Sequence, residues 1–281
     1  MEIIINGKTL DASIDNENTL GEVLANLEDW LSKSGHRISE LKVDGEIVNA
    51  SMIEDIFNRE LKDIKIIAIS TNVVAELTAA SLLNLLEDLT DYENLNFESK
   101  ADFFSKWKDT ATAMFISAEI PDLFAFCKST FSSGEMTSLT LRSIIEEIQR
   151  EVQTPVAEIK NIEPVLNEIC ERLIRLPLDI QTGKDSTAAQ TIQIFSAVTE
   201  KVFRIFRQLD TQGYFAEENS VTPVNGKPLA SLITGFGNVL EELLEAYEKS
   251  DSVLVGDLTE YEAAPKLKEL YTAILQRIKN D

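Results

Sequence analysis

The spacing of apolar residues changes once along this chain of 281 residues, and that change most constrains its fold. Up to residue 71 apolar and polar residues mostly alternate, as they do along β-strands, with a helical segment between. From Asn72 onward apolar residues recur about every 3.6 residues, which is typical of helices. We therefore predict an α+β protein with a small sheet domain over residues 1–71 and an all-α helical-bundle region after it.

Two hairpin signals and one helix signal set the order of elements in the first 71 residues. Asn6-Gly7 and Asp44-Gly45 each lie between apolar runs and predict tight turns between antiparallel strands, the first pair ending near Ile14. Thr19 and Glu22 form a capping-box pattern that predicts the start of a helix. The segment Ser51–Glu54 predicts a short helix, and residues 64–69 predict a last strand.

This order, two strands, a helix, two strands, a short helix and a strand, resembles the ubiquitin-like family and its β-grasp fold. Ubiquitin-like modifiers need a free Gly-Gly end, yet this chain has no glycine between Gly45 and Gly134. The resemblance therefore implies a docking domain and not a modifier. Apolar residues occupy both faces of the expected sheet, so we expect a second cover, from the helical region or a second copy, near Ile4 and Ile66 or Ile67.

The helical region is expected to consist of a small bundle over residues 72–135 and a larger one over residues 136–281. A polar segment near Gly134 is the basis for this division. Proline lacks the backbone N–H that continues a helix. We therefore expect Pro177 to end one helix and Pro265 to kink the last one.

The chain is strongly acidic, with 48 acidic and 26 basic residues and a net charge of −22. Such a charge repels phosphate backbones and anionic lipids, which argues against nucleic-acid and membrane partners. It is typical of a soluble cytosolic protein, and the alternative is a protein partner with a basic surface. Cys127 and Cys170 stand alone in apolar helical contexts, which indicates buried free thiols and a reducing, cytoplasmic location. No targeting signal or membrane span is evident in the sequence.

Histidine and cysteine, which many catalytic centres use, are scarce in this chain, with one and two residues. The single histidine, His36, lies in a polar connection, so histidine-based triads and the usual zinc spacings are not expected. Gly183-Lys184-Asp185 resembles the end of a phosphate-binding loop, but Leu178 stands where that loop requires glycine. We predict no catalytic residues, no metal and no cofactor.

Carboxylates are concentrated near the C-terminus, and three polar residues there attract attention. Asp257, Glu260 and Tyr261 are expected to follow the apolar stripe of Leu254 and Leu258. A polar group on such a stripe must be paired, so we predict a structural polar node between helices. The expected donors are Tyr247, Arg172 or Arg175. An alternative is a carboxylate-based metal-dependent enzyme that uses Asp257, Glu260 and Glu262.

The segment Asp251–Pro265, with the turn at Gln181–Asp185 before it, resembles an uncharacterised group of small bacterial helical proteins. The resemblance covers about residues 140–281 and implies a bacterial origin and a recurring helical module. It implies no activity.

The longest aperiodic segment runs from Thr211 to Pro228 and contains Tyr214 and Phe215 beside Glu217-Glu218. Aromatic residues ringed by charge are typical of interface centres, although these two could also pack into the bundle. The leading interpretation is a non-enzymatic intracellular adaptor or scaffold that joins a docking domain to an acidic helical module. The alternatives are an acidic export or assembly chaperone for a secretion or flagellar system, and the metal-dependent enzyme. The sequence leaves open whether the protein forms a homo-oligomer.

Overall fold

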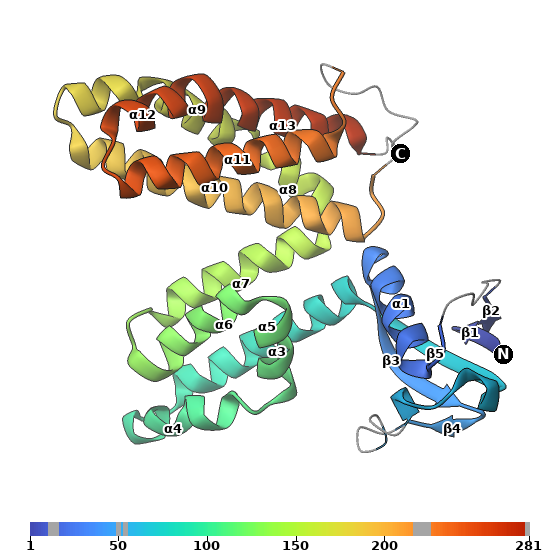
Figure 1. Ribbon diagram of the computed structural model, residues 1–281. Coiled ribbons are helices and arrows are strands. Elements are labelled where there is room, and N and C mark those ends of the chain that lie inside the picture. Colours follow the sequence, from blue (N-terminus) through green and yellow to red (C-terminus); the bar gives the residue numbers. More distant parts are fainter. Residues whose placement is uncertain (11–16, 49–51, 53–55, 216–225, 279–281) are drawn as a thin grey trace. The chain divides into compact units, whose positions relative to one another are not determined.

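The structure is a computed structural model that describes residues 1–10, 17–48, 52, 56–215 and 226–278. The predicted α+β class is confirmed: a five-stranded sheet near the N-terminus precedes a mostly helical remainder (Figure 1). The chain forms two compact units, called here the N-terminal unit (residues 1–153) and the C-terminal unit (residues 154–281). The predicted divisions after residues 71 and 135 remain predictions. Parts of the expected second strand and short helix, and Glu217-Glu218, lie outside the described residues.

The N-terminal unit contains the sheet and the first group of helices. Its elements are β1 (Glu2–Ile5), β2 (Lys8–Thr9), α1 (Leu20–Lys33), β3 (His36–Val43), β4 (Glu46–Ile47), the 3₁₀ turn η2 (Leu61–Asp63), β5 (Ile66–Val73), α3 (Val74–Asn94), α4 (Phe97–Trp107), α5 (Ala111–Glu119), α6 (Pro121–Lys128), the π-helix η3 (Ser129–Ser133) and α7 (Ser138–Gln153). The strand order is β2-β1-β5-β3-β4, with β1 parallel to β5 and the other pairs antiparallel.

Both predicted hairpin turns form where the sequence places Asn-Gly and Asp-Gly. The φ angles are 50° at Asn6 and 77° at Gly7, and 51° at Asp44 and 90° at Gly45. These positive values suit the two-residue turns whose twist matches that of the flanking strands. The capping box of α1 is also present, because Glu22 N donates to Thr19 Oγ1 over 3.4 Å and Glu22 accepts from Thr19 N in return.

Helix α1 covers one face of the sheet (Figure 1). The side chains of β5 point alternately to that face and to the other. Ile67 and Ile69 are buried in the core against α1, at 0% and 2% exposure. Ile66 points to the opposite face and is 39% exposed. Of the two alternatives at this position, Ile66 and not Ile67 therefore belongs to the second face. Ile4 is half-buried and pairs with Ala68. Cover over this face, by the helical region or by a second copy, remains a prediction.

Helices α3 to α7 enclose a second core in the N-terminal unit, and aromatic rings fill much of it. Trp107 is 3% exposed, and its ring centroid lies 5.8 Å from that of Phe124 and 5.1 Å from that of Phe131. Its Nε1 donates to Asp88 Oδ2 over 2.9 Å. Partial burial raises the pKa of the Asp88 carboxyl, more than the bond from Trp107 lowers it. Trp30, on α1, is 52% exposed.

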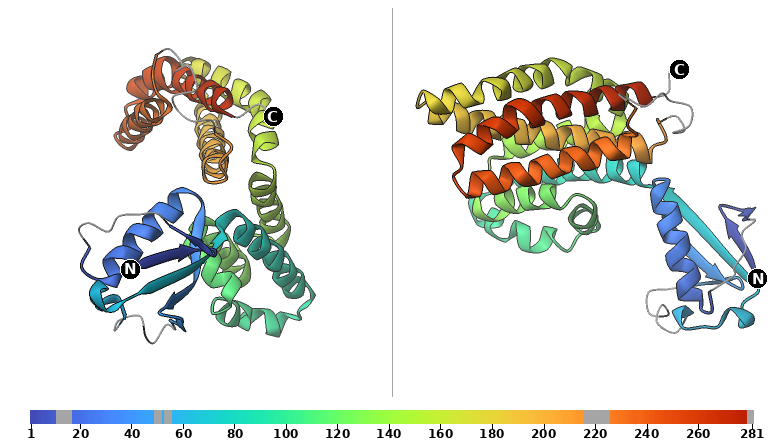
Figure 2. Two further views of the ribbon diagram at one scale, coloured as in Figure 1. Left: turned by 90° about the vertical axis from the view of Figure 1, so that its right-hand side faces the viewer. Right: turned by 45° about the horizontal axis from the view of Figure 1, so that its top comes forward.

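The regular elements of the C-terminal unit are all helices in its described part, with one isolated β-bridge between Phe215 and Ile278. Its elements are α8 (Pro155–Asn161), α9 (Glu163–Gln181), α10 (Asp185–Thr211), α11 (Leu229–Glu248), α12 (Ser252–Asp257), the π-helix η5 (Leu258–Ala263) and α13 (Ala264–Arg277). Helices α9, α10, α11 and α13 lie side by side around one apolar core (Figure 2). The ring of Phe236 on α11 lies 6.4 Å from Phe195 and 6.2 Å from Phe203, both on α10.

Two proline predictions need correction. Pro177 does not end its helix, because α9 continues through it to Gln181. A Cβ placed on Gly256 would lie 3.2 Å from the Pro177 Cβ, so the missing side chain of Gly256 allows α12 to pack closely on this proline. Pro265 lies in the first turn of α13, directly after the π-helix. The last helix, which was predicted to be one kinked helix, thus consists of three segments: α12, η5 and α13.

Candidate functional site

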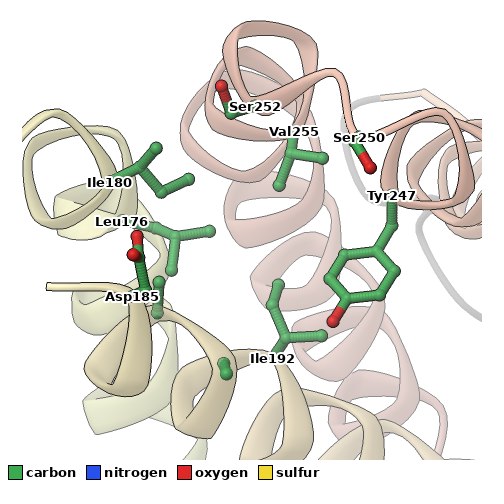
Figure 3. A pocket seen from close by; sticks show the side chains of 10 residues that line it. Leu176, Ile180, Asp185, Ile192, Tyr247, Ser250, Ser252 and Val255 are labelled. Carbon is green, nitrogen blue, oxygen red and sulfur yellow. The ribbon is translucent and has the colours of Figure 1, made fainter. Parts of the chain in front are cut away.

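A pocket of about 450 Å³ lies at one end of the C-terminal unit. It is built by the end of α9, the start of α10, the end of α11 and the start of α12 (Figure 3). Its lining residues are Leu176, Ile180, Asp185, Ala188, Ala189, Ile192, Tyr247, Ser250, Ser252 and Val255. The pocket thus joins segments that are up to about eighty residues apart in sequence and belongs to one compact unit.

The pocket has a buried apolar floor and an exposed rim. Leu176, Ala188 and Val255 are at most 9% exposed, and all three belong to the core of the unit. The rim residues Asp185, Ala189, Ser250 and Ser252 are exposed. Tyr247 is 59% exposed, and its side chain extends from α11 toward Ile192 on the facing wall (Figure 3). The site can therefore be reached from solvent without any movement of the core.

Two turns hold the walls in place. In the first, Gly183 has φ 71° and Lys184 N donates to Asp179 O over 2.8 Å, so that α10 begins at Asp185 directly after α9. In the second, Ser250 has φ 56°, and Asp251 Oδ1 accepts from Leu254 N over 3.0 Å as the cap of α12. Both turns are formed by backbone and capping bonds, which fix where the helices begin.

The surroundings of the pocket are acidic. From Glu241 to Glu262 the chain carries eight acidic residues and one basic residue, Lys249. Lys249 Nζ pairs with Glu245 over 2.9 Å, and Lys184 Nζ pairs with Asp179 over 3.0 Å. Within the described part of the chain, no basic side chain forms an ion pair with Asp185 or Glu248. The two lysines near the mouth of the pocket, its opening to solvent, are therefore already paired and do not neutralise Asp185 or Glu248.

The predicted polar node is not buried. Asp257 is exposed and Tyr261 is 64% exposed, while Val255, Leu258 and Thr259 form the buried stripe. Tyr261 bonds to the neighbouring Glu260 carboxylate, and this bond raises the pKa of Tyr261. The expectation that these residues are buried between helices is wrong, because Leu254, which was expected to mark the buried stripe, is itself 44% exposed. Asp257 and Tyr261 follow it at successive spacings of three and four residues, on the exposed face.

The residues that were expected to donate hydrogen bonds to the polar node lie elsewhere or pair with other carboxylates. Arg172 pairs with Glu168 over 2.5 Å, and Arg175 lies 4.0 Å from Glu171. Tyr247 lines the pocket. Glu262, the third residue of the alternative metal site, pairs with Lys266 over 2.9 Å. Among the described residues, no group of three or more His, Cys, Asp or Glu side chains is placed to hold a metal ion.

The two aromatic residues of the aperiodic segment are not equivalent. Phe215 is 9% exposed, and its ring lies 5.4 Å from that of Phe206, with the guanidinium of Arg277 5.5 Å above it. It packs into the bundle, as the alternative interpretation holds, and it does not form an exposed anchor. Tyr214 is 37% exposed, and its role in binding a partner stays a prediction.

Both cysteines are free and buried, as predicted. Burial raises the pKa of Cys127 to about 12 and that of Cys170 to about 11. Both thiols are therefore protonated near neutral pH, and the thiolate is the reactive form. Across the helices that the structure describes, none combines the length and apolar character needed to cross a membrane.

The sequence did not point to the pocket. Its lining residues come from four segments, and only packing brings them together. The structure shows the surface more clearly: Tyr247, which lines the pocket, and Leu244, one turn before it on α11, are each 59% exposed. Neighbouring large apolar residues that are exposed on a charged helix are typical of a binding surface.

Two family models match parts of the chain. Residues 1–72 match the TP0873 N-terminal domain, and residues 157–273 match a domain of unknown function, DUF8042. Over 275 residues the chain is 23% identical to an uncharacterized protein of Treponema pallidum (strain Nichols), covering 98% of this chain and 96% of the relative. No solved structure matches the chain. The similarity therefore extends through the sheet and the helical region and reaches a bacterial protein, while the ubiquitin-like identity stays a prediction.

Proposed function

We propose that this chain is a non-enzymatic interaction protein, an adaptor or scaffold, and that its C-terminal unit binds a protein partner at the pocket. The observation that carries the proposal is an apolar pocket with an exposed rim in a strongly acidic surrounding. Interface centres tend to combine an apolar, often aromatic, centre with a charged periphery. Tyr247 and Leu244 supply the exposed apolar surface, and the carboxylates near them supply the periphery.

The proposal assigns the sheet domain a second docking role, near Ile4 and Ile66. It also assigns the protein to the cytoplasm, where two buried thiols would remain reduced. The absence of a catalytic role is part of the proposal and rests on the sequence, which has one histidine and two isolated cysteines.

A site-specific crosslinking experiment tests this function. A photoreactive amino acid would replace Tyr247 in the full chain, expressed in its native cell. Tyr261 gives a matched control, because it is also an exposed tyrosine of the C-terminal unit but does not line the pocket. We expect a discrete protein adduct from position 247 and little from position 261.

Two results would count against the proposal. Absence of a protein adduct at both positions would argue against a protein-binding role of this unit. An adduct at position 261 alone would keep the interaction role but would move the surface to the segment around Asp257, Glu260 and Tyr261.

A further inference from the structure

We infer that the pocket receives one large apolar side chain from a partner segment in which lysine or arginine residues flank that side chain. The inference deepens the proposed function and rests on it, because it names the chemistry of the segment that the C-terminal unit binds. It follows from the shape of the pocket, from the charge around it and from the polar groups at its mouth.

The shape fits an anchoring side chain better than a separate small molecule. Pockets for small molecules usually enclose most of the ligand surface. Here five of the ten lining residues are exposed, and the buried ones lie on the floor. An occupant would thus contact Leu176 and Val255 at its inner end and remain open to solvent at its outer end. A side chain that continues into a peptide backbone has this arrangement.

The charge near the pocket selects the residues beside the anchor. Lys184 and Lys249 already pair with Asp179 and Glu245, as described above, so a basic partner would not compete with free lysines at the mouth. Asp185 lies on the wall formed by α10, and Glu248 follows the lining residue Tyr247. These carboxylates would repel an acidic partner segment and attract a basic one.

Two polar groups at the mouth could hold the flanking residues. Asp185 begins α10, and Tyr247 extends from α11, so a carboxylate and a phenol come from different walls of the pocket (Figure 3). A lysine or arginine beside the anchor could donate to the Asp185 carboxylate in a charge-assisted hydrogen bond. The Tyr247 ring offers an aromatic face to the apolar anchor and to a cation next to it.

Peptide selection tests the inference without knowledge of the natural partner. A phage-displayed library of random peptides would be selected on the full-length protein, and the enriched peptides would be synthesised for binding measurements. We expect enriched peptides to share one large apolar position with lysine or arginine on either side. Replacement of the apolar residue by alanine should weaken binding by about tenfold or more, as at interface anchors.

Two matched variants locate the binding site. Ala189→Phe places a phenyl group at the rim of the pocket, whereas Gln190→Phe adds the same group at the next exposed position of α10, which does not line the pocket. We expect Ala189→Phe to abolish binding and Gln190→Phe to leave it intact. Tyr247→Ser, at an exposed position, should also weaken binding, and circular dichroism would show that each variant is folded.

A charge variant tests the flanking residues. Asp185→Asn with Glu248→Gln should weaken binding of the basic peptides and reduce its dependence on salt. Enriched peptides without a basic bias, or equal binding to Ala189→Phe and to the unchanged protein, would overturn the inference. Equal affinity for free N-acetyltryptophanamide and for the whole peptide would also overturn it, since the site would then be one for small molecules. The crosslinking result at Tyr247 could still support the proposed function in each case.

Discussion

At the scale of single residues, the environment of a side chain near the C-terminus depends on helical phase. Asp257 and Tyr261 would share a face with Leu254 and Leu258 in a regular helix. In the structure Leu254, Asp257 and Tyr261 are exposed, whereas Val255, Leu258 and Thr259 are buried. The sequence pattern could not reveal this, because Leu254 and Val255 are both apolar and spacing alone does not show which of them faces the core.

The first prediction concerns the stability contributed by this segment. Asp257→Ala should change the free energy of unfolding by less than about 0.5 kcal/mol, because the side chain is exposed. Thr259→Ala gives a comparison, because Thr259 is 0% exposed and its Oγ1 donates to Val255 O over 2.9 Å. We expect it to cost about 1–3 kcal/mol. Urea denaturation would measure both, and a larger loss for Asp257→Ala would restore the buried-node interpretation.

The second prediction concerns pH. Partial burial raises the pKa of Asp88 above its ordinary value of 3.8, so the folded chain keeps this proton to a higher pH than the unfolded chain. The contribution of Asp88 to stability must therefore fall as the pH rises from 3.8 through the raised pKa. Asp88→Asn should remove this fall while an amide oxygen still accepts from Trp107.

Denaturation of the unchanged protein and of Asp88→Asn at a series of pH values would measure the difference. The variant should gain stability relative to the unchanged protein as the pH rises. Asp102→Asn, at an exposed position of α4, serves as the control. Parallel pH profiles for the unchanged protein and Asp88→Asn would contradict the prediction.

At the scale of elements, short-range signals predicted the sheet well. The turns at Asn6-Gly7 and Asp44-Gly45 and the capping box at Thr19 depend only on neighbouring residues, and all three are present. Features that depend on distant residues were missed. Pro177 stays inside α9 while Gly256, far along the chain, leaves room for its ring, and the pocket needs four segments to meet.

The third prediction separates the two faces of β5. Ile67→Ala should cost about 2–5 kcal/mol, because the side chain is 0% exposed and its removal leaves a cavity against α1. Ile66→Ala, one residue away and 39% exposed, should cost less than about 1 kcal/mol in a monomer. A large cost for Ile66→Ala that rises with protein concentration would instead show that a second copy covers this face.

At the scale of the whole molecule, each apolar core lies within one of the two units. The core of the C-terminal unit runs from Ile159 to Ile278, and the two cores of the N-terminal unit lie before residue 153. A compact unit with a separate core can in principle fold alone. The presence of helices in the second part was predicted from spacing, but the position of the boundary depends on tertiary packing.

The fourth prediction is that residues 154–281 fold without the remainder. The fragment should be helical by circular dichroism and should unfold cooperatively. Calorimetry of the full chain should show two transitions, one of which matches the fragment. The fragment also contains the whole pocket, so it should bind the selected peptides as the full chain does. An unfolded fragment would show that the C-terminal unit depends on the N-terminal one.

The places of the two tryptophans make the two units optically distinct. Trp30 and Trp107 both lie in the N-terminal unit, and the chain contains two tryptophans in total. Indole emission from the protein therefore reports on the N-terminal unit alone, from one solvent-exposed and one buried ring. The C-terminal unit contains no tryptophan and therefore contributes no indole emission. A tryptophan carried by a peptide would be the one indole in a complex with residues 154–281, so its blue shift would report entry into an apolar site directly.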